Sequence, residues 1–402
     1  MRSNTRVYSL PRWRLTRWLV DAGPGVPTDI RQALVGQLYG TLPVYAGGVA
    51  NTIIVSAAIA ARMPTWPFIA WVAFEVLICV ARLIVLIIAR RNGLERRRTP
   101  TDIYIVLSVA WSATVGYGVV VSLASGDWIA STLACLSAAA MVGGICFRNF
   151  SAPRLAGLMT VFSLGPALPG AMLAGEPLMY IVFAQIPMYV FAMTVAAFRL
   201  NKLLLATMQA ERENDHRARH DSLTGLSNRT GLMAAVETRL AAARRADDTV
   251  ALLFLDLDGF KSVNDTYGHA AGDRLLTMVA ERLSRVLLAA DTAARLGGDE
   301  FVVLADGLTN ERAVALGEHL IATIATSYDL GDGISISIGV SVGIAMAPEH
   351  GTNFTDLLAV ADAALYEAKL GGKSRCCMAS SETNLAALQR VRGDSGNVGA
   401  AA

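Results

Sequence analysis

The stretch TAARLGGDEFVVLA, residues 292–305, places two glycines and two acids between two short runs of strand-forming residues. Glycine tolerates the backbone angles of tight turns, so the stretch predicts a hairpin folded around Gly297 and Gly298. Asp299 and Glu300 then lie at the tip of the turn. The paired glycines also allow a substrate to approach the backbone closely, because no Cβ is in the way. The stretch therefore predicts a β-sheet with an acidic site at the end of one hairpin.

Strand and helix patterns alternate around this hairpin, from residue 221 onward. They predict a buried strand at 249–256, helices at 272–289, 310–326 and 354–370, and a strand or bent strand pair at 334–346. After Arg375 the pattern is lost, which predicts a disordered tail at 379–402. The region 220–378 is thus expected to form a soluble α/β domain.

Two further acids, Asp256 and Asp258, end the first apolar strand. Acids at the ends of buried strands are costly unless something cationic neutralises them. Mg²⁺ takes one or two carboxylates together with substrate phosphate oxygens. A pair of such ions can activate a hydroxyl and stabilise the leaving group in an in-line phosphoryl displacement. From spacing alone, a metal–nucleotide site and solvated turn acids are both open.

The first half of the chain has the composition of a membrane protein. Apolar residues make up 53% of the chain and charged residues 17%, and between residues 103 and 146 only Asp127 is charged. A helix needs roughly 20 apolar residues to cross a hydrocarbon core of ~30 Å. Six stretches qualify, at approximately 39–61, 67–89, 103–125, 128–146, 155–175 and 178–198. The sequence predicts an all-α, six-helix transmembrane unit at 39–199.

Arginines are concentrated in alternate connections of this unit. They are frequent in the segment 1–38 and in 90–98, whereas Arg62 is the only basic residue in the three connections on the other side. The positive-inside rule then places both chain ends in the cytoplasm, with 1–38 as a cytoplasmic segment. No signal peptide is expected, because these first residues lack an uninterrupted apolar core.

Glu75 and Arg82 are charged residues within the second predicted span, two turns apart and so on roughly one face. Ionisable groups inside a membrane are costly and often functional. One reading is a pair neutralised against a neighbouring helix, or an Arg82 that reaches the inner interface. The other reading is a role in sensing a ligand or relaying a signal. The sequence does not decide between them.

The segment 200–219 turns polar and reads as the sixth span continuing into the cytoplasm as a connecting helix. It lacks sustained heptads, so a short dimerising stalk and a solvated linker are both open. The formal net charge of the whole chain is only +2, and no continuous basic face is evident. Nucleic acid is therefore not an expected partner.

Four ordered stretches resemble the signature motifs of the GGDEF-domain family of diguanylate cyclases. They are DSLTGLSNR (221–229), FLDLDGFKSVNDTYGHAAGD (254–273), RLGGDEF (295–301) and ADAALYEAK (361–369). The resemblance implies an antiparallel sheet flanked by helices, like that of polymerase palms and class III nucleotide cyclases. It also implies the synthesis of cyclic di-GMP from two GTP molecules by a homodimer. The resemblance covers only the C-terminal part of the chain; together with the predicted spans and the arginine distribution, it predicts a multi-pass protein of a bacterial inner membrane with a cytoplasmic catalytic domain.

The resemblance also assigns metal ligands. Asp256, Asp299 and Glu300 would bind two Mg²⁺ or Mn²⁺ ions per active site, with the Leu257 carbonyl as a further ligand. Asp299 and Glu300 would be the catalytic pair. Glu300 would either assist the second metal or deprotonate the attacking 3′-hydroxyl.

Substrate contacts are implied in the same way. Backbone amides of Gly259 and Phe260 would bind phosphates, with Lys261 nearby, and Asn264 and Asp273 would read the guanine edge. A carboxylate accepts from guanine N1–H and the exocyclic amine, and such a site rejects a base that leaves its polar group unpaired.

The remaining substrate candidates are His269, Lys369 and Lys373. His269 either supports its loop or takes part in catalysis. The two lysines would contact terminal phosphates, and Lys373 stands where the family usually has arginine, which keeps the charge but loses the bidentate fork.

The inhibitory product-binding motif of the family, Arg-x-x-Asp, reads Leu288-Ala289-Ala290-Asp291 in this chain. Its arginine is missing, so this site is expected to be degenerate. The alternative to an active cyclase is a silent GGDEF module that binds nucleotide or docks a partner. The signature acids and glycines are all present, which favours the enzyme. The signal received by the membrane unit cannot be read from the sequence.

Overall fold

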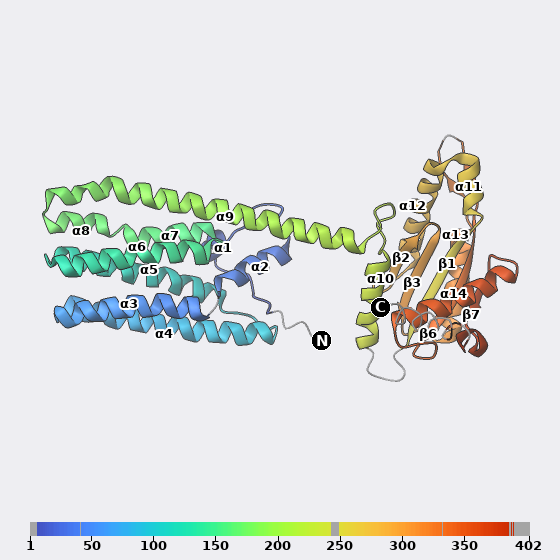
Figure 1. The fold of residues 1–402 in the computed structure, drawn as a ribbon, viewed down its shortest axis with the longest axis horizontal. Coiled ribbons are helices and arrows are strands. Elements are labelled where there is room, and N and C mark those ends of the chain that lie inside the picture. The colour runs from blue at the N-terminus through green and yellow to red at the C-terminus, as the bar shows by residue number, and fades with distance from the viewer. Residues whose placement is uncertain are drawn as a thin grey trace, which may run out of the picture. The chain divides into compact units, whose positions relative to one another are not determined.

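The computed structural model describes residues 6–40, 42–242, 249–331, 333–385, 387 and 389. The chain divides into two compact units, Met1–Glu211 and Arg212–Ala402, which we call the helical unit and the sheet unit. Figure 1 shows helices throughout the first and a sheet flanked by helices in the second. The division falls within one long helix, α9 (Val182–Arg219).

The helical unit has two short N-terminal helices followed by longer ones. Its elements are α1 (Arg14–Leu19), α2 (Thr28–Leu38), α3 (Leu42–Arg62), α4 (Trp66–Leu94), α5 (Thr101–Ala124), α6 (Trp128–Asn149), α7 (Pro153–Leu164), α8 (Ala167–Ala174), the 3-10 helix η1 (Pro177–Ile181) and α9. The predicted fifth span is divided between α7 and α8, where Pro166 has no amide hydrogen to continue the helix. The predicted connecting segment 200–219 is helical and continuous with the sixth span.

Five stretches of the described residues are long and apolar enough to cross a membrane. They are Trp66–Leu94, Thr101–Ala124, Trp128–Asn149, Pro153–Ala174 and Pro177–Arg219. The helix α3 lies where the first of six spans was predicted, but it is not among these five. The helical unit is therefore suggested to be a membrane domain with five candidate spans, and the sixth span stays a prediction.

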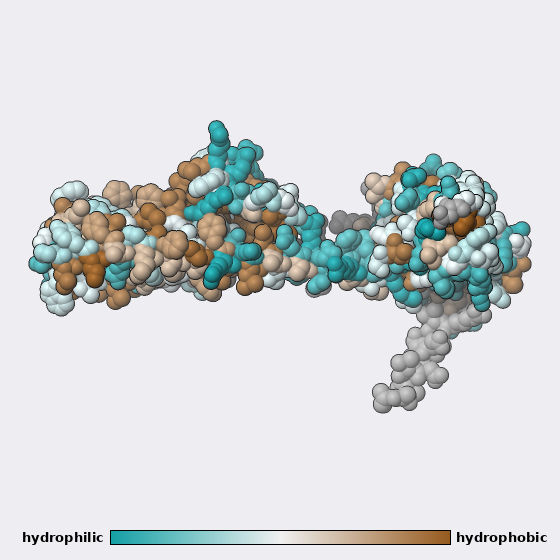
Figure 2. Space-filling view, turned by 90° about the horizontal axis from the view of Figure 1, so that it is seen from above, coloured by the Kyte–Doolittle hydropathy of each residue, from teal (hydrophilic) through white to brown (hydrophobic). Residues whose placement is uncertain are grey.

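Apolar side chains cover much of the surface of the helical unit. Leu77, Phe147 and Phe191 are 63%, 75% and 71% exposed. Figure 2 shows extensive hydrophobic colouring over these helices, whereas the visible surface of the sheet unit is largely hydrophilic. Soluble proteins rarely expose contiguous apolar patches of this extent. The surface of the helical unit thus suits a hydrocarbon environment.

The sheet unit combines a five-stranded sheet with flanking helices. Its elements are α10 (Arg229–Ala242), β1 (Val250–Asp258), α11 (Phe260–Tyr267), α12 (His269–Val286), β2 (Thr292–Gly297), β3 (Glu300–Asp306), α13 (Asn310–Ile324), β4 (Tyr328–Asp329), β5 (Ser335–Ile336), β6 (Gly339–Ala347), α14 (Phe354–Leu370) and β7 (Cys376–Met378). The strand order is β2-β3-β1-β6-β7, and β4 and β5 form a separate pair. The predicted strands and helices are present, with ends shifted by a few residues.

The sheet is mixed, so the expectation of a wholly antiparallel sheet is wrong at one edge. β1 pairs antiparallel with β3 and β6, and β2 pairs antiparallel with β3. β7, which the sequence analysis left without an assignment, pairs parallel with β6. The helix α14 connects these two strands, and a helical crossover returns the chain in the parallel direction.

Both faces of β1 are buried. Leu253 and Leu255 pack in a core with α12 and α13, whereas Leu252 and Phe254 pack in a second core with α10 and α14. This explains the continuous apolar run in the sequence. A Cβ at Gly343 of β6 would lie 2.1 Å from the Ala361 carbonyl oxygen of α14, so glycine allows this helix to pack directly on the sheet.

The predicted disordered tail begins too early at residue 379. Residues 381–385 are helical, and Ala379, Thr383 and Ala387 are buried. The Thr383 hydroxyl donates a hydrogen bond to Glu367 of α14 at 2.5 Å. Small apolar residues without clear periodicity thus complete a core that the sequence pattern did not reveal. Residues 386, 388 and 390–402 lie outside the described residues.

Candidate active site

Three carboxylates lie at one side of the sheet, where β1 ends and β3 begins. Asp256 on β1 stands directly opposite Glu300 on β3, so their side chains share one face. Asp299 precedes Glu300 in the turn, and its carbonyl oxygen accepts a hydrogen bond of 3.3 Å from the Leu257 amide. The four residues predicted as metal ligands are therefore neighbours. The predicted hairpin is present, and Gly298 adopts a left-handed φ of 51° at its turn.

Negative charge accumulates at this edge, and one of its acids is paired directly with a lysine. Lys369 of α14 places its Nζ 2.8 Å from Asp256 Oδ1. Burial and the negative charge of Asp256 raise the pKa of Asp299. Burial, Asp256, Asp299 and Asp362 raise the pKa of Glu300. Protonation or a bound cation would relieve this repulsion, so the edge has the electrostatics of a cation site.

Arg295 holds the turn at Gly297 and Gly298 in place. Its guanidinium donates to the Gly298 carbonyl oxygen from Nε at 3.0 Å and from NH2 at 2.8 Å, and forms an ion pair of 3.0 Å with Asp221. Burial opposes ionisation of Asp221, but hydrogen bonds from Thr224 and Arg295 bring its pKa below the usual value. Both residues stand in stretches already noted in the sequence, but only the fold shows that they meet.

Asp258 has a structural role that the sequence analysis did not find. Its carboxylate accepts hydrogen bonds from the Ser341 hydroxyl at 2.9 and 3.0 Å and from the Ser374 amide at 3.0 Å. Ser374 and the preceding Lys373 both have positive φ, at 47° and 64°. Asp258 thus anchors the turn that carries Lys373. No local pattern links residues more than eighty positions apart, so this contact could not be predicted from the sequence.

The phosphate-binding candidates lie just beyond β1. Gly259, with a φ of 85°, precedes the first turn of α11, and Phe260 is the first residue of that helix. Free backbone amides at a helix N-terminus favour anions. Lys261 follows on the same turn, and His269 begins α12; both are exposed. The helix α11 itself was not predicted, because its eight residues are too short for a clear period.

The two guanine-reading candidates lie on neighbouring helices. Asn264 is on α11 and Asp273 is exposed on α12. A Cβ at Gly272 would lie 1.9 Å from the Asn264 side-chain oxygen, so the amide rests directly against α12 next to Asp273. The fold therefore brings these two side chains to one region of the sheet unit.

No three His, Cys, Asp or Glu side chains among the described residues already form a metal-ligand cluster. The donor set at the strand ends nevertheless fits Mg²⁺ or Mn²⁺, which accept few carboxylates and complete their shell with water and phosphate oxygens. Burial, and then the neighbouring carboxylates, raise the pKa values of Asp299 and Glu300, so a bound cation would favour their ionised forms. Asp256, Asp299 and Glu300, with the Leu257 carbonyl, are the residues that would hold the ions.

The degenerate inhibitory motif forms a closed turn. The Leu288 amide donates to Asp291 Oδ2 at 2.9 Å, and the Leu288 side chain is 74% exposed. Arg239 reaches this turn by donating to the Ala290 carbonyl oxygen. The same guanidinium also binds Leu304 and Asp306, so it is committed to holding α10 on the sheet.

Comparison with known proteins identifies the sheet unit. A family model described as diguanylate cyclase, GGDEF domain, matches residues 218–375. The bifunctional diguanylate cyclase/cyclic di-GMP phosphodiesterase MucR of Pseudomonas aeruginosa is 41% identical over 194 residues, which are 48% of this chain and 28% of MucR. The diguanylate cyclase TpbB of the same organism is 41% identical over 155 residues, 38% of this chain and 36% of TpbB.

One solved structure is similar to part of this chain. The structure of a TpbB variant comprising only the GGDEF domain is 38% identical, covers 42% of this chain and 99% of the solved chain, and has a TM-score of 0.40. The chain spans only about a third or less of the length of the two curated relatives, 28% of MucR and 36% of TpbB. The family model places the similarity at residues 218–375, within the sheet unit.

Proposed function

Because the chain belongs to the GGDEF family through its sheet unit, we propose that it is a membrane-anchored diguanylate cyclase that converts two GTP molecules into cyclic di-GMP and two diphosphates. The observation that carries the proposal is the edge formed by Asp256, Asp299 and Glu300, where the pKa values of the last two are raised. A silent GGDEF module has no need to keep three mutually repelling acids together.

Different residues of the site would bind different parts of GTP. The amides of Gly259 and Phe260, with Lys261, would hold the phosphates at the start of α11. Asn264 and Asp273 would orient the guanine, and His269 stands beside them at the start of α12. Lys373, on the turn anchored by Asp258, would contact the terminal phosphate. Lys369 would contact the same phosphate once the substrate competes with Asp256 for its ammonium group.

The acids of the hairpin would act on the reacting groups. Two bound Mg²⁺ ions supply charge neutralisation and hydroxyl activation in such a displacement. Asp256 and Asp299 would fix the ions, and Glu300 would either assist the second ion or accept the proton of the 3′-hydroxyl. The Arg295 contact to Gly298 keeps the turn rigid, so the acids hold their positions without reorganising during the reaction.

Two sheet units are needed for the reaction. One site binds one GTP, and each 3′-hydroxyl must attack the α-phosphorus of the nucleotide on the other unit. The proposed enzyme is therefore a homodimer, and any signal at the helical unit would act by changing how two sheet units meet. The arginine distribution supports a cytoplasmic sheet unit at the inner membrane of a bacterium.

Nucleotide-product analysis of the full-length protein with GTP and Mg²⁺ tests the proposal against the silent module. The cyclase reading expects cyclic di-GMP from the wild type and none from a folded Asp299→Ala or Glu300→Ala variant. Glu318→Gln, a change to an exposed acid of α13, is the matched control and should retain turnover. Nucleotide binding without turnover by the wild type would establish the silent module instead.

A further inference from the structure

The helical unit contains a cavity of about 130 Å³ that the proposed chemistry does not use. It lies among α3, α4, α5, α6 and α7, and its polar lining includes Tyr45, Arg82, Trp111, Arg148 and Asn149. A space of this size has room for several water molecules. Two arginines thus face one cavity within a unit whose outer surface is apolar.

Arg82 is the more deeply buried of the two. The residue is 4% exposed; among the described residues its Nε has no hydrogen-bond partner, and its NH2 donates to the Ser108 hydroxyl at 3.4 Å. The guanidinium carbon lies 4.7 Å from the centre of the Trp111 ring and 5.4 Å from that of Tyr45. Aromatic faces stabilise a cation only in part, and a buried charge needs an opposite charge to offset its lost hydration.

Arg148, on α6, also lies close to the Tyr45 ring. Its guanidinium carbon is also 5.4 Å from the centre of Tyr45, and its NH2 donates to the Tyr104 hydroxyl at 2.6 Å. Neither Arg82 nor Arg148 has a carboxylate within ion-pair distance among the residues described by the structure. Two cations therefore share one cavity without a counter-ion from the described chain.

The acid that could have neutralised them is engaged elsewhere. Glu75 is fully buried, and it accepts hydrogen bonds from Trp111 Nε1 at 2.8 Å and from the Thr114 hydroxyl at 2.5 Å. Glu75 and Arg82 form no ion pair with each other among the described residues; both contact the neighbouring helix α5, Glu75 through Trp111 and Thr114 and Arg82 through Ser108. Glu75 instead fixes the indole against which Arg82 stacks.

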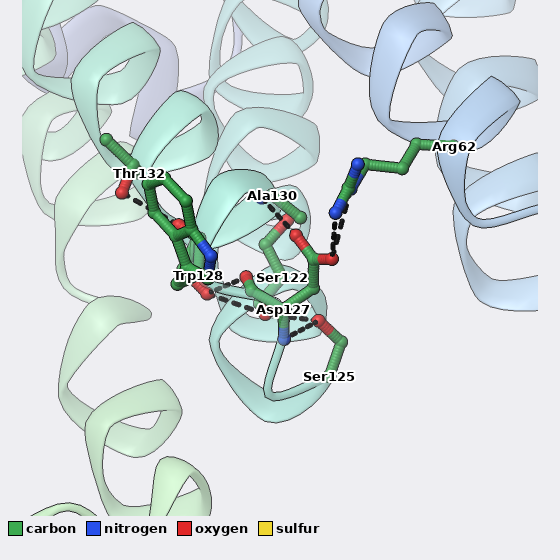
Figure 3. Close-up of polar contacts among 8 residues, drawn as sticks. Arg62, Ser122, Ser125, Asp127, Trp128, Ala130 and Thr132 are labelled. Carbon is green, nitrogen blue, oxygen red and sulfur yellow. Dashed lines mark hydrogen bonds and ion pairs between the residues drawn. The ribbon is translucent and has the colours of Figure 1, made fainter.

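Another arginine of the helical unit is paired fully. Arg62, at the end of α3, donates from Nε and NH2 to Asp127 Oδ2 at 3.0 and 2.9 Å (Figure 3). Asp127 also caps α6 by accepting from the Ala130 amide. This exposed arginine thus has a carboxylate partner, whereas Arg82 and Arg148 have none among the described residues.

We propose that Arg82 and Arg148 form a binding site for a small oxyanion, a carboxylate or phosphate group that enters between α3 and α6. Guanidinium groups bind these anions through charge-assisted hydrogen bonds. Gly48 and Gly144 line the cavity on the two helices, and a Cβ at either would meet no atom within 4 Å. Gly144 is also exposed, so the cavity opens to the surface of the bundle there. The anion is either a free ion or the head group of a lipid.

The site is close to a contact with α9. Ser151, three residues beyond Arg148, accepts a hydrogen bond of 3.1 Å from the Asn201 side chain of that helix. The helix α9 continues to Arg219 and so runs into the sheet unit, which begins at Arg212. An anion that shifts the end of α6 would therefore also change the position of α9. This link to turnover rests on the proposed function, but the binding site itself does not.

Thermal unfolding of the full-length protein in phosphatidylcholine nanodiscs tests the site without measuring turnover. All six tryptophans lie between residues 13 and 128, so their fluorescence reports only on the helical unit. One series adds inorganic phosphate or acetate at constant ionic strength, and another replaces part of the lipid by phosphatidic acid. A ligand that binds only the folded state raises the unfolding midpoint with concentration. A rise in the first series identifies a free anion, and a rise only in the second identifies a lipid head group.

Three variants locate the effect. Arg148→Gln should lower the affinity for the anion by about tenfold or more, because a charge-assisted contact is lost. The rise of the unfolding midpoint should then require a correspondingly higher anion concentration. Gly144→Leu fills the mouth of the cavity without a change of charge and should abolish the response. Arg62→Gln removes an equal charge outside the cavity and should keep the response. The proposal is overturned if no anion or lipid raises the wild-type midpoint, or if the rise persists unchanged in Arg148→Gln and Gly144→Leu.

Discussion

Replacing Asp299 by asparagine is expected to stabilise the sheet unit while abolishing cyclic di-GMP synthesis. Burial and the charge of Asp256 raise the pKa of Asp299, so its ionised form is unfavourable in the folded protein. Carboxylates on neighbouring strand ends lie about 5–7 Å apart and repel by about 1–3 kcal/mol at an effective dielectric constant of about 20–40. The ion pair between Lys369 and Asp256 offsets part of this. The expected gain is about 1–2 kcal/mol, or about 3–6 °C in the unfolding midpoint.

The gain should depend on pH in a defined direction. A carboxyl group whose pKa is higher in the folded than in the unfolded state destabilises the fold when it is ionised. The penalty is absent below the ordinary pKa of aspartate, about 3.9, and is complete above the raised value. The advantage of Asp299→Asn should therefore be present at pH 8 and disappear toward pH 4. Mg²⁺ should stabilise the wild type at pH 8 and have less effect on the variant.

Circular dichroism of residues 212–402 at both pH values, with and without Mg²⁺, measures these effects. This fragment contains both cores of the sheet unit, and Glu318→Gln serves as the charge-matched control. A variant that is less stable than the wild type at pH 8 without metal would refute the electrostatic reasoning. Equal stabilisation of both proteins by Mg²⁺ would refute the assignment of Asp299 as a metal ligand.

Three further outcomes are expected for the enzyme and one for its topology. Arg295→Ala should lower kcat by about tenfold or more in a folded protein, since the turn loses contacts worth about 1.5–3 kcal/mol, and unchanged turnover would exclude this role. Asp258→Asn should raise the KM for GTP more than it lowers kcat, because the turn carrying Lys373 loses its anchor; a change in kcat alone would contradict this. Steady-state kinetics with added cyclic di-GMP should show little non-competitive inhibition of the wild type, and Leu288→Arg should introduce it; potent inhibition of the wild type would mean that another basic residue has replaced the missing arginine. Protease protection should place Ala402 inside the cell, and an external location would refute the predicted orientation.

The sequence alone determined the elements that depend on neighbouring residues. The apolar run of β1, the glycine turn and the final helix were predicted close to their observed bounds, because strand and helix periods and turn chemistry are local properties. The motif stretches also identified the acids of the hairpin. The length of the apolar segments predicted helices long enough to span a bilayer, since hydrocarbon thickness sets the length of a span.

Contacts between distant residues were decided only by the tertiary structure. The register that places Asp256 opposite Glu300, the hydrogen bonds that assign Asp258 to the Lys373 turn, and the parallel strand β7 all join segments far apart in the chain. Arg82 and Arg148 likewise come from two helices, and only Arg82 lies within one of the spans predicted from the sequence. Whether such a charge finds a partner depends on how the helices pack, and periodicity along a single segment contains no information about that packing.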